Sequence, residues 1–406
     1  MDLGNALSPI PSSYASDAIG RKMTLIISAA TNLLASVFVL IGTHSAWLYL
    51  ARLCAGLGKG ISFAVIPIYL AEVANVEIRG GLSTMFIGLL NIGMFYDYAL
   101  GPIISMGALD YANLIIPVLF IITFPFFPES PYYLLMKARE GSAKNSLRKY
   151  RQVKEDDSTL EREVKQIQKT VENNMKNRGR FVDLWATPSS RRALLIISLL
   201  ALFQRSSGIS PTLAYSTVIM PKTGGGIDVP SYMIIFSFIL VVANYIATPL
   251  VDKIGRKPLL IISCVSTAIC TFAVSIYYFL ERSTNIDVTS IQWIPYAGVL
   301  IFPITYSLGI GFIPSTLVGE LFPINVKSYA SSVSAIILAA TSCVVNYVFY
   351  IVAVKFGPHY MFWFFTLAMI VATIFTHYYV FETKGKTFLE IEEILAEKTE
   401  RSARNN

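Results

Sequence analysis

Charged residues are scarce in this sequence. Asp, Glu, Lys and Arg make up 15% of its 406 residues, whereas 54% of the residues are hydrophobic. An average soluble chain has about 25% charged residues. This composition excludes an ordinary soluble protein and predicts an integral membrane protein, with the lipid bilayer as its surroundings. The net charge is +7. We attribute it to basic residues in the turns and tails on one side of the predicted membrane spans, so we expect no nucleic-acid partner.

Cysteine and histidine are also scarce. The cysteines lie inside apolar runs and have no disulfide or metal spacing: Cys54, Cys264, Cys270 and Cys343. The histidines lie at the edges of apolar runs, with no cysteine or carboxylate at catalytic or metal spacing: His44, His359 and His377. We therefore expect no enzymatic activity, no metal site and no cofactor.

Long apolar runs are abundant. Each is long enough to cross about 30 Å of hydrocarbon as a helix. Spans are predicted near residues 24–42, 46–71, 81–104, 111–127, 192–219, 231–251, 258–280, 294–319, 328–354 and 360–380. Residues 3–15 form an apolar segment too short to span, and no basic region precedes it as in a signal peptide.

Three charged motifs occur twice, in the same order, at the ends of apolar runs. The first motif is Asp17-Ala-Ile-Gly-Arg-Lys22, which returns as Asp252-Lys-Ile-Gly-Arg-Lys257. The second is a glutamate seven residues before a basic residue, Glu72/Arg79 and Glu320/Lys327. The third is Pro-Glu129-Ser-Pro, with Phe-Glu382-Thr-Lys-Gly as its counterpart. Such a repeat predicts two parallel, pseudo-symmetric halves. The halves would be six-helix bundles, and the first helix and part of the second are expected to be missing.

The repeated charges are expected to form ion pairs at one face of the membrane. Each exposed pair contributes about 0–1 kcal/mol, but a network can bias an equilibrium between two states by a few kcal/mol. We predict an inner gate made of Asp17, Arg21, Glu72, Arg79, Glu129, Asp252, Arg256, Glu320, Lys327 and Glu382. The alternative is that these charges only mark the cytoplasmic border.

The distribution of basic residues predicts the topology. Most of the 33 Lys and Arg lie on the side of the repeated motifs, and the other side has Lys222, Arg282 and Lys355. The positive-inside rule makes the motif side cytoplasmic. We predict an incomplete N-terminal bundle (1–128), a cytoplasmic linker (129–190), a C-terminal bundle (191–380) and a cytoplasmic tail (381–406). We expect the plasma membrane as the location.

The linker is predicted to contain amphipathic helices. In residues 160–172 the apolar side chains Leu160, Val164, Ile167 and Val171 share one helical face. Glu161, Lys165 and Lys169 share another face at i,i+4 spacing. The alternative is a solvated linker. A similar apolar pattern predicts a helix over residues 387–398.

These motifs, together with Arg52-x-x-x-Gly56 and Glu320-Leu-Phe-Pro323, resemble the sugar porter family of the major facilitator superfamily. Leu-Asn91-Ile-Gly93 and Asn325-Val-Lys327-Ser328 are most similar to its facilitated trehalose transporter branch. The resemblance covers nearly the whole chain. It implies alternating access around a central site, with the charged motifs as the inner gate.

The resemblance also implies where a sugar would bind. The family's seventh-helix pattern Gln-Gln-x-Ser-Gly-Ile-Asn is Gln-Arg-Ser-Ser-Gly-Ile-Ser at residues 204–210, and its tenth-helix tryptophan is Ser315. Family glutamine or asparagine positions fall on Ile87 and Leu240, while Asn346 matches the eleventh-helix asparagine. The implied substrate-binding residues are Gln204, Arg205, Ser207, Ser210, Ser315 and Asn346.

Two cations lie near the middle of predicted spans. Arg205 is roughly 20 Å from the inner end of its span at 1.5 Å per residue, and an intramembrane cation indicates a functional site by default. Arg205 would favour an anionic or strongly hydrogen-bonding substrate; alternatively it points away from the site. Lys59 is expected to form an intramembrane charge pair with Asp97.

Three functions remain open from the sequence. The first is facilitative uniport of a sugar of the trehalose or hexose type. The second is a transport-incompetent relative that serves as a sensor or scaffold, favoured by the altered pocket residues and the short first segment. The third is a carrier of another small solute, including an anion, because of Arg205. The sequence does not decide the exact substrate, proton coupling, protein partners or oligomeric state.

Overall fold

The structure, a computed structural model, describes residues 1–74, 79–152, 158–176, 181–219, 228–284, 288–322, 324–386, 390–391 and 393–395. Every regular element in these ranges is a helix, as predicted. Among them, nine helices are long and apolar enough to cross a membrane, and the shorter apolar helix Met85–Leu100 matches the predicted span 81–104. The prediction of an all-α, multi-pass membrane protein is confirmed.

The chain forms two compact units, which we describe separately. The first unit comprises Met1–Ile87, Ser105–Leu184 and Pro323–Ile336. The second comprises Gly88–Ile104, Trp185–Phe322 and Ile337–Asn406. Two long helices contribute residues to both units, α5 (Arg79–Leu100) and α17 (Ile324–Lys355).

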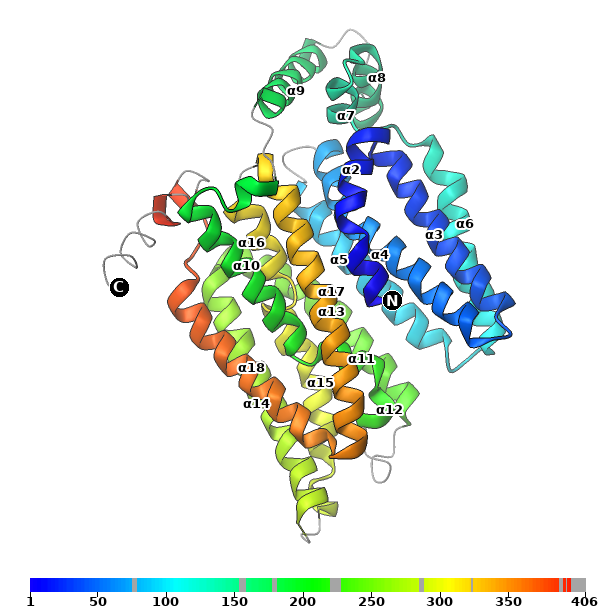
Figure 1. Ribbon diagram of the computed structural model, residues 1–406, viewed down its shortest axis with the longest axis vertical. Coiled ribbons are helices and arrows are strands. Elements are labelled where there is room, and N and C mark those ends of the chain that lie inside the picture. The colour runs from blue at the N-terminus through cyan, green and yellow to red at the C-terminus, as the bar shows by residue number, and fades with distance from the viewer. Residues whose placement is uncertain are drawn as a thin grey trace. The chain divides into compact units, whose positions relative to one another are not determined.

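The first unit also contains α1 (Asp2–Leu7), α2 (Pro9–Ile19), α3 (Arg21–Ile41), α4 (Ser45–Val73), α6 (Met106–Thr123), η1 (Phe124–Phe126), α7 (Pro131–Met136), α8 (Glu140–Arg151), α9 (Ser158–Lys176) and η2 (Phe181–Leu184). Figure 1 shows α3 packed between its neighbours α4 and α6. The short apolar segment 3–15 lies in α1 and α2, so it is helical apart from an interruption at Ser8.

Small residues let α4 approach its neighbours closely, as expected for helices in a membrane. Ser28 of α3 donates a hydrogen bond to the carbonyl of Gly58 at 2.8 Å, and its hydroxyl lies 2.7 Å from that of Ser62. A Cβ at Gly58 would lie 2.6 Å from Oδ1 of Asn32. A Cβ at Gly56 would collide with the backbone of Met1 in the same way.

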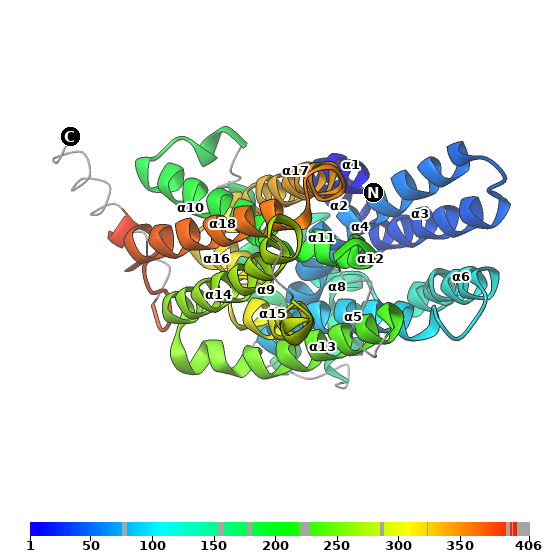
Figure 2. The same ribbon diagram turned by 90° about the horizontal axis from the view of Figure 1, so that it is seen from below.

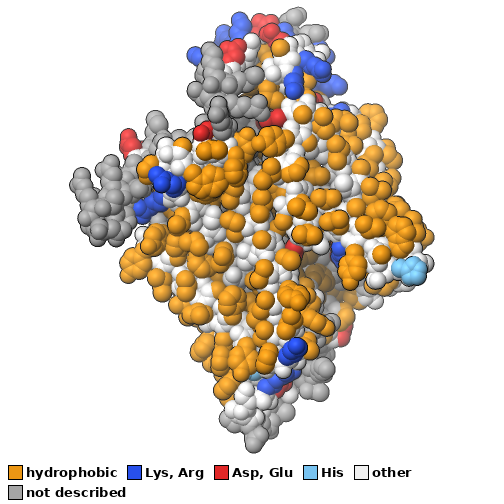
Figure 3. Space-filling model, viewed as in Figure 1, with side chains coloured by type: hydrophobic (Ala, Val, Ile, Leu, Met, Phe, Trp, Pro, Cys, Tyr) orange, Lys and Arg blue, Asp and Glu red, His pale blue; other side chains and the backbone are white. Residues whose placement is uncertain are grey.

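Helices α7, α8 and α9 form a small apolar core of their own. The predicted apolar face of α9 is buried in it: Leu160, Val164, Ile167 and Val171. The amphipathic-helix prediction is therefore confirmed for α9. The charged face makes contacts between helices, because Glu161 pairs with Lys144 of α8 at 3.1 Å. Figure 3 shows Lys, Arg, Asp and Glu gathered over these helices, whereas hydrophobic side chains cover the helices that span the membrane.

The second unit contains α10 (Pro188–Ser206), α11 (Ile209–Ala214), α12 (Ser216–Ile219), α13 (Val229–Ile254), α14 (Arg256–Ser283), η3 (Thr289–Ile291), α15 (Trp293–Leu308), α16 (Ile313–Leu321) and α18 (Pro358–Tyr379). Helix α14 packs along α18 and α15, and α15 also packs on α13 (Figures 1 and 2). The core is rich in aromatic residues, including Tyr232, Phe236, Tyr277, Phe349 and Phe365.

Two spans predicted as continuous helices are interrupted in the second unit. The span 192–219 breaks between α10 and α11, where Gly208 has a φ of +96° that other residues rarely adopt. A Cβ at Gly208 would also lie 2.7 Å from the ring of Phe365. The span 294–319 breaks between α15 and α16, at residues 309–312. Both breaks lie next to the predicted substrate-binding positions.

Candidate functional site

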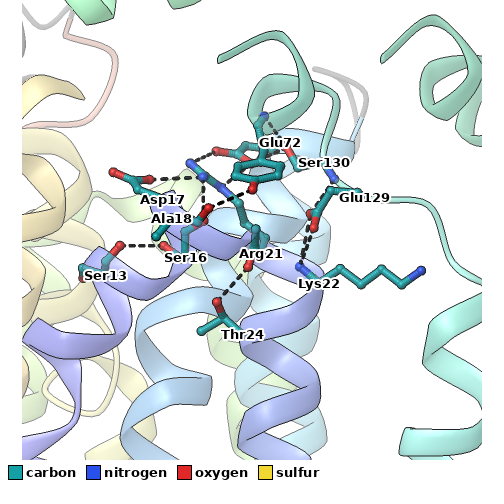
Figure 4. Close-up of polar contacts among 12 residues, drawn as sticks. Ser13, Ser16, Asp17, Ala18, Arg21, Lys22, Thr24, Glu72, Glu129 and Ser130 are labelled. Carbon is teal, nitrogen blue, oxygen red and sulfur yellow. Dashed lines mark hydrogen bonds and ion pairs between the residues drawn. The ribbon is translucent and has the colours of Figure 1, made fainter. Parts of the chain in front are cut away.

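The first charged cluster lies in the first unit, where α2 turns into α3 (Figure 4). Arg21 makes a bidentate contact with Glu72, with Nε and Nη2 each 3.0 Å from a carboxylate oxygen. Its Nη1 is 3.1 Å from Oδ1 of Asp17 and donates to the carbonyl of Ser16 at 3.1 Å. Arg21 is 8% exposed. Three of the predicted gate residues are thus joined through one buried guanidinium.

Glu129 lies at the N-terminus of α3, next to this cluster. The backbone N–H of Lys22 donates to both Glu129 carboxylate oxygens, at 3.1 and 3.2 Å. A carboxylate is stabilised there because the first N–H groups of a helix have no partner within the helix. The following residue, Ser130, donates its hydroxyl to Glu72. Glu129 and Ser130 therefore connect the start of α7 to both α3 and α4 (Figure 4).

The second charged cluster repeats this arrangement in the second unit. Arg256 contacts Glu320 through Nε at 3.1 Å and Nη2 at 3.0 Å. Glu382 accepts the backbone N–H groups of Arg256 and Lys257 at the N-terminus of α14, at 2.9 and 3.0 Å. Thr383 donates its hydroxyl to Glu320 at 2.5 Å. Thr383 occupies the place that Ser130 has in the first cluster.

Glycine is required at both turns. Gly20 has φ +103° and Gly255 has φ +107°, which L side chains rarely adopt. A Cβ at Gly255 would lie 2.6 Å from Oε2 of Glu382, and one at Gly20 would meet Glu129 even more closely. The glycine in each repeated motif thus leaves room for the carboxylate of the third motif.

The two clusters described above contain seven of the ten predicted gate residues, and the remaining three are Arg79, Asp252 and Lys327. The side chains of Arg79 and Asp252 lie outside the described residues. Lys327 is exposed and belongs to the first unit, at the beginning of α17. Their participation in a gate stays a prediction.

Sequence reasoning missed the two hydroxyl residues, Ser130 and Thr383. The signal was present, because each directly follows the glutamate of the third motif. A hydroxyl there can donate to the glutamate that pairs with the arginine, which an apolar residue cannot do.

The acidity of Glu382 reflects its position at the start of α14. Burial raises the pKa of this carboxyl, but hydrogen bonds from the backbone N–H groups of Lys384, Arg256, Lys257 and Thr383 lower it by more. The pKa therefore lies below its ordinary value of 4.5. Because the folded-state pKa is lower than the unfolded-state pKa, Glu382 stabilises the fold above about pH 4.5 and loses this effect as the pH falls through the lowered value.

We expect Glu382→Gln to reduce the acid sensitivity of the protein. The wild type should melt at a higher temperature than the variant at pH 7, and the difference should narrow below about pH 4.5. Melting temperatures of the detergent-solubilised proteins, measured between pH 7 and 3.5, test this. Glu140→Gln, which removes an exposed carboxylate of α8, is the control. A wild-type advantage that stays constant with pH would contradict the interpretation.

A polar cluster lies at the helix break of the second unit. Arg205 Nη1 donates to the hydroxyl of Ser210 at 3.3 Å, and Ser342 donates to the same hydroxyl at 3.2 Å. Asn346, one turn along α17, is 3.5 Å from Ser342. Gln204 donates to the carbonyl of Gly311 at 2.6 Å, which joins the two broken helices. Ser342 was not predicted; its spacing of four residues from Asn346 was the available signal.

The other predicted substrate-binding residues differ in their surroundings. Ser207, which caps the end of α10, is fully buried, and its hydroxyl donates to the carbonyl of Gln204. Ser315 is exposed in α16.

Lys59 lies in the first unit, 6.0 Å from the Phe63 ring, and Asp97 lies in the second. The Lys59–Asp97 pair stays a prediction.

A model of the family described as "Sugar (and other) transporter" matches residues 1–395, almost the whole chain. The chain belongs to the sugar (and other) transporter family. The facilitated trehalose transporter Tret1 of Polypedilum vanderplanki is 31% identical over 378 residues, which are 92% of this chain and 74% of the relative. Tret1 of Anopheles gambiae is 30% identical over 375 residues, 92% of this chain and 47% of the relative.

Solved structures identify the fold of this member of the sugar (and other) transporter family. The inward-open xylose transporter XylE of E. coli has a TM-score of 0.78 at 21% identity, over 96% of this chain and 86% of that chain. The XylE structure bound to 6-bromo-6-deoxy-D-glucose has a TM-score of 0.73 at 22% identity, over 97% and 86%. The predicted major facilitator fold is therefore confirmed. The chain spans about half the length of the A. gambiae relative.

Proposed function

We propose that this protein is a facilitative transporter that carries sugars of the trehalose or hexose type across a membrane by alternating access. The observation that carries the proposal is the pair of matched ionic clusters around Arg21 and Arg256. Each half of the chain builds the same arrangement from motifs far apart in the sequence. Membership in the sugar (and other) transporter family supports the same function.

In this proposal the two clusters form the inner gate. Arg21 holds α3 to α4 through Glu72, and Arg256 holds α14 to α16 through Glu320. Such contacts can exist in one state of a carrier and break in another, and a network of them can shift a two-state equilibrium by a few kcal/mol. The proposal includes a plasma-membrane location, with residues 129–190 and the C-terminus in the cytoplasm, supported by the basic residues on that side.

The polar cluster supplies groups that can bind sugar hydroxyls. Gln204 Oε1 and Asn346 Oδ1 are buried acceptors without a hydrogen-bond partner among the described residues. Buried polar atoms are normally paired. Each of these two oxygens can therefore accept a hydrogen bond from a hydroxyl group of a ligand. The proposal places the sugar against these two side chains, in the second unit.

Uptake into proteoliposomes that contain the purified full chain tests the function. We expect saturable entry of labelled trehalose or glucose that is unchanged when a protonophore removes any pH gradient. Absence of saturable uptake for every sugar tested, from protein that still unfolds cooperatively, would contradict transport and favour the sensor or scaffold hypothesis.

Asn346→Leu is expected to weaken sugar binding while preserving the branched heavy-atom skeleton of the side chain. Loss of one hydrogen-bond partner costs about 1–3 kcal/mol, which corresponds to an increase in KM of roughly 5- to 150-fold. Uptake kinetics of the reconstituted variant measure this. Cys343→Ala changes an exposed residue of the same helix and should leave KM unchanged. Equal KM values for wild type and Asn346→Leu would remove Asn346 from the binding site.

A further inference from the structure

Arg205 is a cation in the membrane-spanning part of the second unit whose charge is not neutralised by the residues around it. Its Nη1 donates to Ser210 at 3.3 Å, and its Nε is buried without a hydrogen-bond partner. Within the described part of the chain, no carboxylate lies within ion-pair distance of this guanidinium. An unpaired cation within the membrane-spanning part of a protein is costly, so the position favours an anion as its partner.

The groups next to Arg205 can bind the rest of such a ligand. The hydroxyls of Ser210 and Ser342 can donate or accept, and both residues are more than nine-tenths buried. Gln204 Oε1 and Asn346 Oδ1 add two unpaired acceptors. A ligand with several hydroxyls and one anionic group would satisfy all of these atoms together.

We propose that this cluster binds a sugar acid, with Arg205 determining specificity for its carboxylate. The inference rests on the sugar-transport function proposed above and names the substrate class of that site. The planar guanidinium offers Nε and a terminal nitrogen side by side, a geometry that matches the two oxygens of a carboxylate. Nε, one of these two donors, is the unpaired atom here, and the hydrogen bond to Ser210 is made by Nη1, on another edge of the guanidinium.

The charge of the site argues for a carboxylate over a phosphate monoester. A phosphate monoester carries about −1.5 to −2 charges near neutral pH, while the cluster contains one cation. Transfer of the unpaired second charge into the membrane interior would be unfavourable. A sugar carboxylate carries a single charge, which Arg205 can neutralise completely.

Competition and uptake with matched ligands test the proposal in proteoliposomes containing the full chain. D-Glucuronate, its neutral amide D-glucuronamide, D-glucose and glucose 6-phosphate are compared at pH 7. We expect wild-type protein to bind glucuronate at least about tenfold more tightly than glucuronamide, as for a charge-assisted hydrogen bond. Arg205→Gln should raise the KM for glucuronate about 10- to 100-fold and remove most of the preference for glucuronate over glucuronamide.

Two further variants separate charge from folding. Arg205→Lys keeps the charge but loses the planar pair of donors, so it should retain part of the preference for glucuronate. Arg191→Gln removes an exposed cation from the start of the same helix and should behave as wild type. The melting temperature of each variant is measured with and without glucuronate, so that binding is detected even where transport fails.

The outcomes distinguish this inference from the proposed function. Uptake of glucose or trehalose without binding or competition by glucuronate would overturn the inference and leave sugar transport intact. Equal recognition of glucuronate and glucuronamide, or tighter binding of glucose 6-phosphate, would also overturn it. Absence of uptake for every sugar would contradict the proposed function, and the glucuronate-dependent melting shift would then decide the inference alone.

Discussion

Arg21→Met is expected to destabilise the first unit by about 3–5 kcal/mol, the typical result of removing one partner from a buried ion pair. The guanidinium is nearly buried and holds both Glu72 and Asp17. Without it, Glu72 remains in a largely buried position, where the hydroxyl of Ser130 is its other hydrogen-bond donor in the described structure. The free energy of unfolding, from SDS titration in bicelles, measures this loss.

Two further variants make the Arg21 prediction specific. Arg21→Met combined with Glu72→Leu should recover most of the stability, because an apolar replacement of a whole buried pair is often close to neutral. Arg139→Met, which removes an exposed cation of the same unit, should change the unfolding free energy by less than about 0.5 kcal/mol. If Arg21→Met were as stable as Arg139→Met, the cluster would contribute nothing to the fold.

Gly255→Ala should destabilise the second unit by about 2–5 kcal/mol. Alanine at φ +107° is strained, and its Cβ would displace the Glu382 carboxylate. The backbone N–H groups of Arg256 and Lys257 would then lose their partner. Gly20→Ala should have the same effect in the first unit, through Glu129. The same unfolding measurement applies, and sugar uptake should fall in parallel.

Two other glycines separate the causes of this effect. Gly385 has φ +71° with nothing within 4 Å of an added Cβ, so Gly385→Ala isolates the backbone strain. Gly141 lies in α8 with equally open surroundings and no positive φ, so Gly141→Ala should be neutral or slightly stabilising. If Gly255→Ala cost no more than Gly385→Ala, the contact with Glu382 would not matter for stability.

The ionic clusters were largely predictable from the repeat, whereas the polar cluster was predicted through the family resemblance and without Ser342. Asp17, Arg21, Glu72 and Glu129 were identified because their motifs recur around Asp252. A repeat links residues that are far apart in the chain, so it carries information about contacts. The hydrogen bond between Ser210 and Ser342 has no such signal, because neither serine belongs to a repeated motif.

The helix breaks show a second limit of sequence reasoning. Residues 192–219 and 294–319 are mostly apolar, and hydropathy alone predicts one helix for each. Glycine and proline near Gly208 and Gly311 allow a break but do not require one, since both residues are common within membrane helices. The turn at Gly208 requires glycine, because its φ is +96° and an added Cβ would lie 2.7 Å from the Phe365 ring.

The sequence by itself determined that this is a helical, multi-pass membrane protein with a duplicated plan, because apolar length and repeated motifs are properties of the chain alone. The tertiary structure decided which hydroxyls complete the ion pairs and that Arg205 meets Ser210 with its Nε unpaired. These features depend on side chains from different helices approaching within about 3 Å, the reach of a hydrogen bond. Helix packing determines which side chains come this close. The order of residues along one span carries no information about the helices that pack against it.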